Sequence, residues 1–142
     1  MNNLRFLGKA DKEALDVLSV QIFGQVLDFE GDSFRIGLGL FNESGALLGF
    51  ITGQAVFEQA EIYFIGVDPR SRSLGFGNQL LKAFISACQQ KEAEALFLEV
   101  KASNKRAISF YKKHGFKHSG TRKKYYPNGE DAVLMNFDLG GC

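Results

Sequence analysis

The stretch that decides the fold is Ile65-Gly66-Val67-Asp68-Pro69-Arg70-Ser71-Arg72-Ser73-Leu74-Gly75-Phe76-Gly77-Asn78. It begins as an apolar strand, passes through a basic loop with two glycines, and enters an apolar helix. A helix N-terminus exposes backbone N–H groups, and glycine lets a ligand approach the backbone closely, so a phosphate is the natural ligand of such a turn. A glycine pair alone is weak evidence, because an ordinary helix start also uses these residues.

The chain before this stretch is predicted to hold one helix and three strands. Apolar residues recur at helical spacing over residues 11–23, and Gly24 follows as a stop signal. Two apolar runs, residues 34–41 and 46–57, flank a turn-rich connection over 42–45. With residues 61–67 they predict an antiparallel meander.

The chain after it is predicted to hold a helix, a strand, a second helix and a strand pair. Residues 95–100 form a compact apolar run, and Ser103 or Asn104 can cap the helix that Gly115 ends. A turn over 127–129 separates the last two strands. This order predicts an α/β (α+β) fold, a mixed twisted sheet of about six or seven strands flanked by helices, in a single domain over residues 1–142.

Composition excludes several classes of protein. Hydrophobic residues make up 45% and charged residues 23%, as in ordinary globular proteins. Because 17 Lys and Arg balance 16 Asp and Glu, no direct nucleic-acid partner is expected. The sequence shows no leader pattern and no run of about 18 apolar residues, so neither secretion nor a membrane partner is expected. Two cysteines, Cys88 and Cys142, have no paired spacing, which favours a reducing, cytoplasmic setting.

The spacing Arg72-x-x-Gly75-x-Gly77, between a strand and an apolar helix, resembles the pyrophosphate-binding motif of the GNAT superfamily of N-acetyltransferases. It lacks the Gly-Lys-Ser/Thr ending of a Walker loop. The resemblance implies acetyl-coenzyme A as cosubstrate, without a metal. The implied cofactor-binding residues are Ile65, Gly66, Val67, Arg72, Ser73, Leu74, Gly75, Phe76, Gly77, Asn78 and Asn104.

Two residues are candidates for acid and base catalysis. Glu99 interrupts an apolar strand, and burying an ionised carboxylate in a sheet is costly unless the group is paired or functional. The alternatives to a functional role are that Glu99 is exposed at an edge of the sheet, or that it forms a salt bridge with Lys101 or Lys91. Tyr111 lies about two helical turns beyond Asn104, on the same face of the helix. By itself, a tyrosine beside Phe110 more often serves core packing than chemistry. The string over residues 98–116 resembles the second half of the GNAT fold. That resemblance implies Glu99 as the general base and Tyr111 as the proton donor.

The acceptor is expected to be a primary amine. Residues 62–137, which include Tyr125, Tyr126 and Pro127, resemble the bacterial ribosomal-protein-alanine N-acetyltransferases. This implies a protein N-terminal amine, with Tyr125 and Tyr126 bordering the acceptor groove; alternatively both rings close the core. The basic run over 122–124 is expected to be a solvated face or to meet a cofactor phosphate.

The N-terminal half departs from that family. The family's substrate loop carries a Pro-Trp pair, whereas this chain has no Trp, and residues 29–32 occupy the region. A small amine such as an aminoglycoside, a polyamine or an amino acid therefore stays open as acceptor, and so does a non-catalytic coenzyme A-binding module. An acidic groove would favour a cationic amine, and Asp28, Glu30 and Asp32 are candidates for it.

Overall fold

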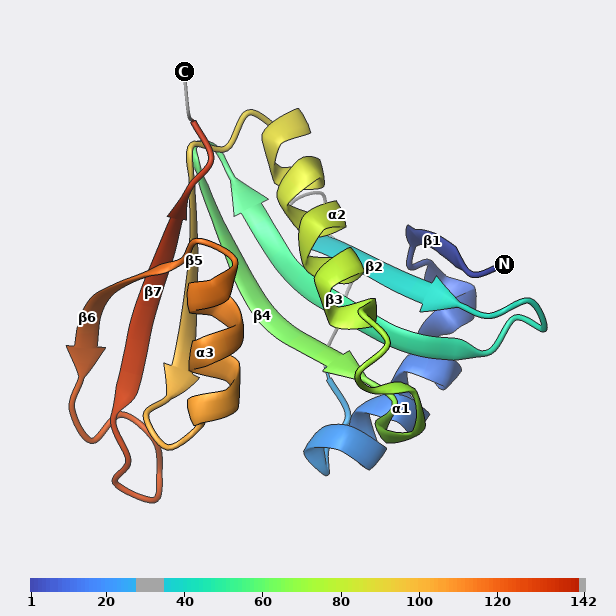
Figure 1. Ribbon diagram of the computed structural model, residues 1–142, viewed down its shortest axis with the longest axis horizontal. Coiled ribbons are helices and arrows are strands. Elements are labelled where there is room, and N and C mark those ends of the chain that lie inside the picture. The colour runs from blue at the N-terminus through green and yellow to red at the C-terminus, as the bar shows by residue number, and fades with distance from the viewer. Residues whose placement is uncertain (28–34, 141–142) are drawn as a thin grey trace.

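One mixed sheet organises this computed structural model, which describes residues 1–27 and 35–140 (Figure 1). Seven strands follow the spatial order β1-β2-β3-β4-β5-β7-β6, and only β4 and β5 are parallel neighbours. The predicted fold class is confirmed. The strands are β1 (Asn3–Phe6), β2 (Arg35–Phe41), β3 (Leu47–Val56), β4 (Gln59–Val67), β5 (Ala95–Lys101), β6 (Lys117–Arg122) and β7 (Ala132–Asp138).

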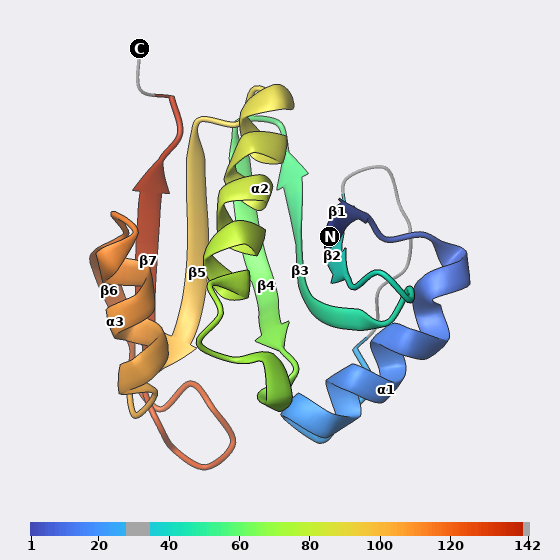
Figure 2. The same cartoon turned by 45° about the vertical axis from the view of Figure 1, so that its right-hand side comes forward.

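Helices cover both faces of the sheet. Helices α2 (Phe76–Gln90) and α3 (Lys105–Lys113) lie on one face, and α1 (Lys12–Phe23) lies on the other (Figure 2). Two short 3-10 turns, η1 (Lys9–Asp11) and η2 (Pro69–Ser71), precede α1 and α2. The larger core cluster lies beneath α2, where Phe84 is fully buried. None of the helices in the described ranges is both long and apolar enough to cross a membrane.

Strands β4 and β5 separate along their length, as Figure 2 shows. They pair only from Gln59–Ala95 to Glu61–Phe97. Beyond Glu61 the edge of β4 that faces β5 has no strand partner in this sheet. A bulge at Tyr63, where the register with β3 shifts, reverses the faces of the following residues. The sheet therefore opens beside the end of β4, directly before the glycine loop.

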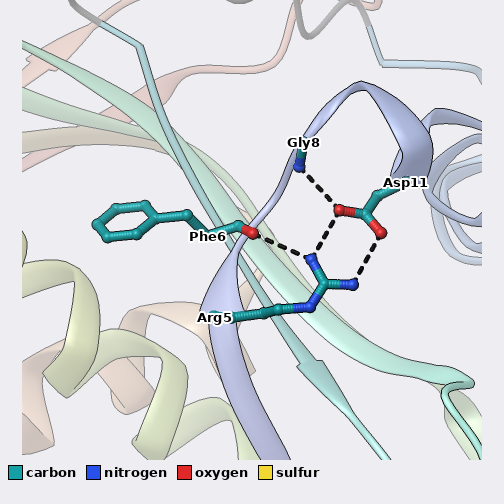
Figure 3. A network of polar contacts seen from close by, with 4 residues as sticks. All are labelled: Arg5, Phe6, Gly8 and Asp11. Atoms are coloured by element: carbon teal, nitrogen blue, oxygen red, sulfur yellow. Dashed lines mark hydrogen bonds and ion pairs between the residues drawn. The ribbon is translucent and has the colours of Figure 1, made fainter.

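The first strand was not predicted. Strand β1 pairs with β2 at the edge of the sheet and is mostly exposed, so it shows little hydrophobic pattern. A local network holds the chain that follows it (Figure 3). The Arg5 guanidinium donates to both Asp11 carboxylate oxygens, at 2.9 and 3.0 Å, and the Gly8 N–H donates to Asp11 at 2.8 Å. Tertiary pairing, not local periodicity, makes this strand.

The other predicted elements are present. Gly24 ends α1 in the left-handed conformation (φ 75°), and Leu15 and Leu18 of α1 are buried against the sheet. The Asn42 side chain accepts hydrogen bonds from the backbone of Ser44 and Ala46 and shapes the predicted hairpin turn. The Phe34 end of the predicted first run lies outside the described residues.

Candidate active site

A cavity of about 580 Å³ lies at the N-terminus of α2, where the strand, the glycine loop and α3 meet. It brings together residues that are far apart in the sequence. All the predicted cofactor residues line it except Leu74, whose side chain is exposed. Its lining residues from β4, the loop and the first turn of α2 are Ile65, Gly66, Val67, Ser71, Arg72, Ser73, Gly75, Phe76, Gly77 and Asn78.

Backbone amides are the main polar groups of this end of α2. Gly75 is the N-cap residue in the left-handed conformation (φ 82°), which glycine adopts without strain, and no side chain caps the helix. The N–H groups of Phe76, Gly77 and Asn78 therefore have no intrahelical acceptor. Gln79 is the first residue that donates back, to the Gly75 carbonyl at 3.1 Å. Three amides and the positive end of the helix dipole border the cavity.

Asp68 shapes the loop between β4 and α2. Its carboxylate accepts from the Arg70 backbone N–H at 2.9 Å and pairs with the Arg70 guanidinium at 2.9 Å. Hydrogen bonding to Arg70 lowers the pKa of Asp68, so this cap stays ionised at neutral pH. Arg72 Nε donates to the Val67 carbonyl at 3.4 Å. These contacts turn the loop back toward the opening of the sheet.

Helix α3 forms the opposite wall of the cavity. Asn104 caps it, as predicted, by accepting from the Ala107 N–H at 3.1 Å. Sequence reasoning missed the other lining residues of α3, although their helical spacing from Asn104 and Tyr111 was a usable signal. His114 joins the two walls, because Nδ1 lies 2.8 Å from the Phe110 carbonyl and Nε2 contacts Asn78 Oδ1. The missed residues are Arg106, Ala107, Phe110, Lys113 and His114.

Tyr111 lines this cavity from the core side. The residue is only 6% exposed, and its ring packs against Phe110 and Phe116 at centroid distances of 5.3 Å. Burial raises the pKa of Tyr111, so the hydroxyl keeps its proton at neutral pH. Within the described residues the hydroxyl has no hydrogen-bond partner. The residue is buried but its unpaired O–H group borders the cavity, where it is available as a hydrogen-bond donor.

Glu99 lies on the other face of the sheet. It borders a groove of about 670 Å³ between the β3–β4 hairpin and strands β5 to β7. Glu99 is two residues beyond Phe97, the last β5 residue that pairs with β4. The two predicted catalytic residues therefore approach the opening of the sheet from opposite faces. The groove is lined by Gln54, Val56, Phe57, Glu58, Gln59, Ala60, Glu61, Phe97, Leu98, Glu99, Ser119, Arg122, Leu134 and Met135.

Glu99 has neighbours that the sequence did not indicate. Its Oε1 lies 3.5 Å from Arg122 Nε, whereas the expected alternatives were Lys101 and Lys91. Glu61 lies on the same face, and burial, followed by the charge of Glu99, raises the pKa of Glu61. In the described part of the chain neither a hydrogen bond nor an ion pair holds the Glu61 carboxylate. The groove is thus acidic at the point where β4 and β5 separate.

Tyr125 and Tyr126 lie beside this groove, but neither lines it. Their rings meet edge to face at 5.1 Å, Arg122 lies 5.4 Å from the Tyr125 ring, and Lys101 lies 5.4 Å from the Tyr126 ring. Burial and then the neighbouring charge of Glu99 raise the pKa of Tyr126. Neither ring belongs to the core clusters, so the alternative in which the pair closes the core is not supported.

Several other predictions concern residues away from these cavities. Burial raises the pKa of the Cys88 thiol to about 12, which suits packing rather than nucleophilic chemistry. Asp28, Glu30, Asp32 and Cys142 lie outside the described residues. Over residues 1–27 and 35–140 no three His, Cys, Asp or Glu side chains are grouped as metal ligands.

Known proteins resemble this chain in sequence and in fold. The model of the acetyltransferase (GNAT) family matches residues 10–116. A ribosomal protein bS18-alanine N-acetyltransferase of Escherichia coli K12 is 35% identical over 96 residues, which are 66% of this chain and 65% of the relative. The chain thus spans about 65% of that relative's length. The enzyme of the same name from Haemophilus influenzae is 34% identical over 117 residues, covering 80% of this chain and 78% of the relative.

The fold agreement extends over the whole chain. The crystal structure of the ribosomal-protein-S18-alanine N-acetyltransferase from Escherichia coli superposes with a TM-score of 0.88 and 27% sequence identity. It covers 100% of this chain and 96% of that one. The glycine loop, the opening between β4 and β5 and the family match agree, and the chain belongs to the acetyltransferase (GNAT) family.

Proposed function

We propose that this protein transfers the acetyl group of acetyl-coenzyme A to a primary amine, with the N-terminal amine of a protein, such as the N-terminal alanine of a ribosomal protein, as acceptor. One observation carries the proposal. The opening between β4 and β5 has a cavity rich in backbone donors on one face and a groove with carboxylates on the other. An anionic cosubstrate and a cationic acceptor can therefore reach the same opening from opposite faces. An acceptor on the ribosome would place the activity in the cytoplasm.

The cavity beside α2 and α3, on the face of the sheet that we call the helix face, fits a diphosphate joined to an extended arm. Unpaired amides of Phe76, Gly77 and Asn78 would receive the diphosphate, as helix N-termini do for anions. The open edge of β4 over Ile65 and Val67 would pair with the amide groups of the arm, as an added strand does. When bound, acetyl-coenzyme A would supply the activated acetyl group as a thioester.

The chain's own residues would move two protons. Glu99, directly or through one water, would accept the proton that the amine loses as its nitrogen attacks the acetyl carbon. A backbone N–H near Val67 would donate to the carbonyl oxygen as negative charge develops on it. Tyr111 would protonate the departing sulfur when the bond between carbon and sulfur breaks. These roles need neither a metal nor a covalent bond to the enzyme.

The acceptor groove supports a second candidate. Glu58, Glu61 and Glu99 outnumber Arg122 among the charged residues that line it, so it attracts cations. A protein N-terminus is cationic, but so is a small amine such as a polyamine or an aminoglycoside. The names of the relatives favour the protein N-terminus, because two of them act on the alanine of a ribosomal protein.

A thiol-release assay over a panel of acceptors tests the proposal. We expect wild-type protein to release coenzyme A fastest with peptides that begin with Ala, and not with the same peptides blocked at the N-terminus. Faster release with polyamines or aminoglycosides would move the acceptor to small amines. No release with any amine, together with retained binding of acetyl-coenzyme A, would leave a non-catalytic binding module.

A matched variant tests the role of Glu99. We expect Glu99→Gln to lower kcat roughly 100-fold, the lower end of the usual general-base contribution, without changing the Kd of acetyl-coenzyme A. The substitution keeps the shape of the side chain and removes its basic oxygen. An unchanged kcat would show that another group accepts the proton.

A further inference from the structure

Arg122 was expected to lie on a solvated face or to meet a cofactor phosphate, but although it is partly exposed it borders the acceptor groove. It ends β6, its side chain lines the acceptor groove, and its Nε lies 3.5 Å from Glu99 Oε1. Glu99 belongs to β5, so this contact crosses β7. Ala132 of β7 pairs with both Arg122 and Lys101, and it is completely buried. The register of three strands therefore delivers one guanidinium to the carboxylate that we propose as the base.

The contact between Arg122 and Glu99 adds little to the stability of the folded protein. The Arg122 side chain is 56% exposed and the Glu99 side chain 25% exposed. Ion pairs at such partly exposed positions contribute little to the free energy of unfolding. A guanidinium, however, is always charged and presents its donors in a rigid plane, which fixes the orientation of a carboxylate.

The charge of Arg122 also acts on a second carboxylate, that of Glu61. Glu61 and Glu99 are diagonal neighbours on β4 and β5, beside the separation of these strands. Each repels the other, and the charge of Arg122 acts against that repulsion. The ionisable side chains that the described residues place on this face include Arg5 from β1, Arg35 from β2, Glu58 from the β3–β4 turn, Glu61 and Tyr63 from β4, Glu99 and Lys101 from β5, Lys117 and Arg122 from β6, Tyr125, Tyr126 and Glu130 from the following loop, and Asp138 from β7.

We infer that Arg122 is a positioning residue for acetyl transfer: its guanidinium holds the Glu99 carboxylate at the opening between β4 and β5 and offsets the repulsion between Glu99 and Glu61. This inference rests on the proposed function, because Arg122 has this role only if Glu99 accepts the proton of the amine. Arg122 itself touches neither the amine nor the thioester.

The dependence of kcat/KM on pH tests the inference. The acidic limb of that profile reports protonation of the group that must be ionised to accept the proton of the amine. In Arg122→Gln the positive charge is gone, so protonation becomes easier and the limb moves to higher pH by about one unit. At a pH below the limb, kcat/KM falls about tenfold, whereas the Kd of acetyl-coenzyme A stays unchanged.

Two further variants separate this role from a structural one. Arg122→Lys should return the limb to its wild-type pH because the charge is restored, with only partial recovery of kcat because the planar donor group is lost. Lys82→Gln, which removes one positive charge from the exposed side of α2, should leave the profile unchanged. Circular dichroism and Tm would show whether all variants are folded.

The outcomes are distinct. A limb at the wild-type pH in folded Arg122→Gln would overturn the inference, and so would a rise in its kcat, which would mean that Arg122 competes with the amine. Failure of Arg122→Lys to restore the limb would also overturn it. If wild-type protein acetylates no amine, the proposed function itself fails. If wild-type protein is active and Glu99→Gln is not, the proposed function stands whatever Arg122 does.

Discussion

The two faces of the sheet present different kinds of polar group to their cavities. On the helix face the polar groups are mainly backbone amides from one continuous segment, Gly75 to Asn78. On the opposite face, which α1 covers only in part and which we call the open face because it carries the acceptor groove, they are side chains such as Glu61, Glu99 and Arg122, from three different strands. A site made of backbone amides keeps its donors when most of its side chains change, although a bulky charged side chain would block it. A groove made of side chains changes its specificity with each substitution. This difference suits a shared cosubstrate and a variable acceptor.

The largest expected effect is on the helix face. Gly77→Asp should raise the Kd of acetyl-coenzyme A by about 100-fold or more, because two like charges about 4 Å apart cost about 4 kcal/mol near a protein surface. Isothermal titration calorimetry measures it. Gly77→Ala is the matched control, because an added Cβ would lie 3.7 Å from Phe110, an ordinary contact. Equal affinity in the Asp variant would show that the diphosphate binds elsewhere.

Tyr111→Phe should lower kcat roughly 100-fold, since it removes the proposed acid while keeping the packing against Phe110 and Phe116. The Kd of acetyl-coenzyme A should stay within about twofold, which is less than 0.5 kcal/mol. Single-turnover kinetics and calorimetry separate the two quantities. An unchanged kcat would assign the proton donor to another group.

Glu61→Gln tests the open face with a smaller effect. We expect the KM of a cationic acceptor to rise about threefold to tenfold, because one carboxylate of the groove is lost. The pKa of Glu61 is higher in the folded than in the unfolded protein. Above the folded pKa, the ionised carboxylate therefore lowers the free energy of unfolding, and this loss disappears as pH falls and Glu61 becomes protonated. The variant should therefore have a slightly higher Tm at pH 7. A lower Tm would mean that the carboxylate has a favourable partner.

Arg5→Ala, far from both cavities, should have the smallest effect. Hydrogen bonding to Arg5 lowers the pKa of Asp11, so the ion pair stabilises the fold above the unfolded pKa, about 3.9. That contribution is lost as pH falls through the folded pKa of Asp11. Thermal melts should show a small decrease in Tm at pH 7 that vanishes at pH 2, with kcat/KM unchanged. A large change in activity would connect the β1 edge to the site.

Much of the helix face could be predicted because its signals are local. One short segment contains the strand, the loop and the start of the helix, together with Arg72, Gly75 and Gly77. Asn104 and Tyr111 are separated by two helical turns, so helix geometry alone places them on one wall of the cavity. Leu74 was the exception, because loop geometry, which periodicity does not describe, turned its side chain outward.

The open face could be predicted only in part. Glu99 was found because a carboxylate in an apolar strand is conspicuous. Its partner Arg122 was not, because the two residues are neighbours only through the register of β5, β7 and β6. Glu61 was missed for a similar reason, since its pairing with Phe97 depends on a parallel crossover that no local pattern specifies. Strand β1 was missed because an exposed edge strand of four residues has almost no periodicity.

By itself the amino-acid sequence determined the order of the elements after β1, the turn residues and the unpaired amides in the first turn of α2. These depend on residues within a few positions of one another, through backbone geometry and hydrophobic period. Only the tertiary structure decided where β4 and β5 separate and which charges meet in the groove. Strand neighbours and register result from burial of the whole sheet against α1 and α2, so that information is spread over the chain.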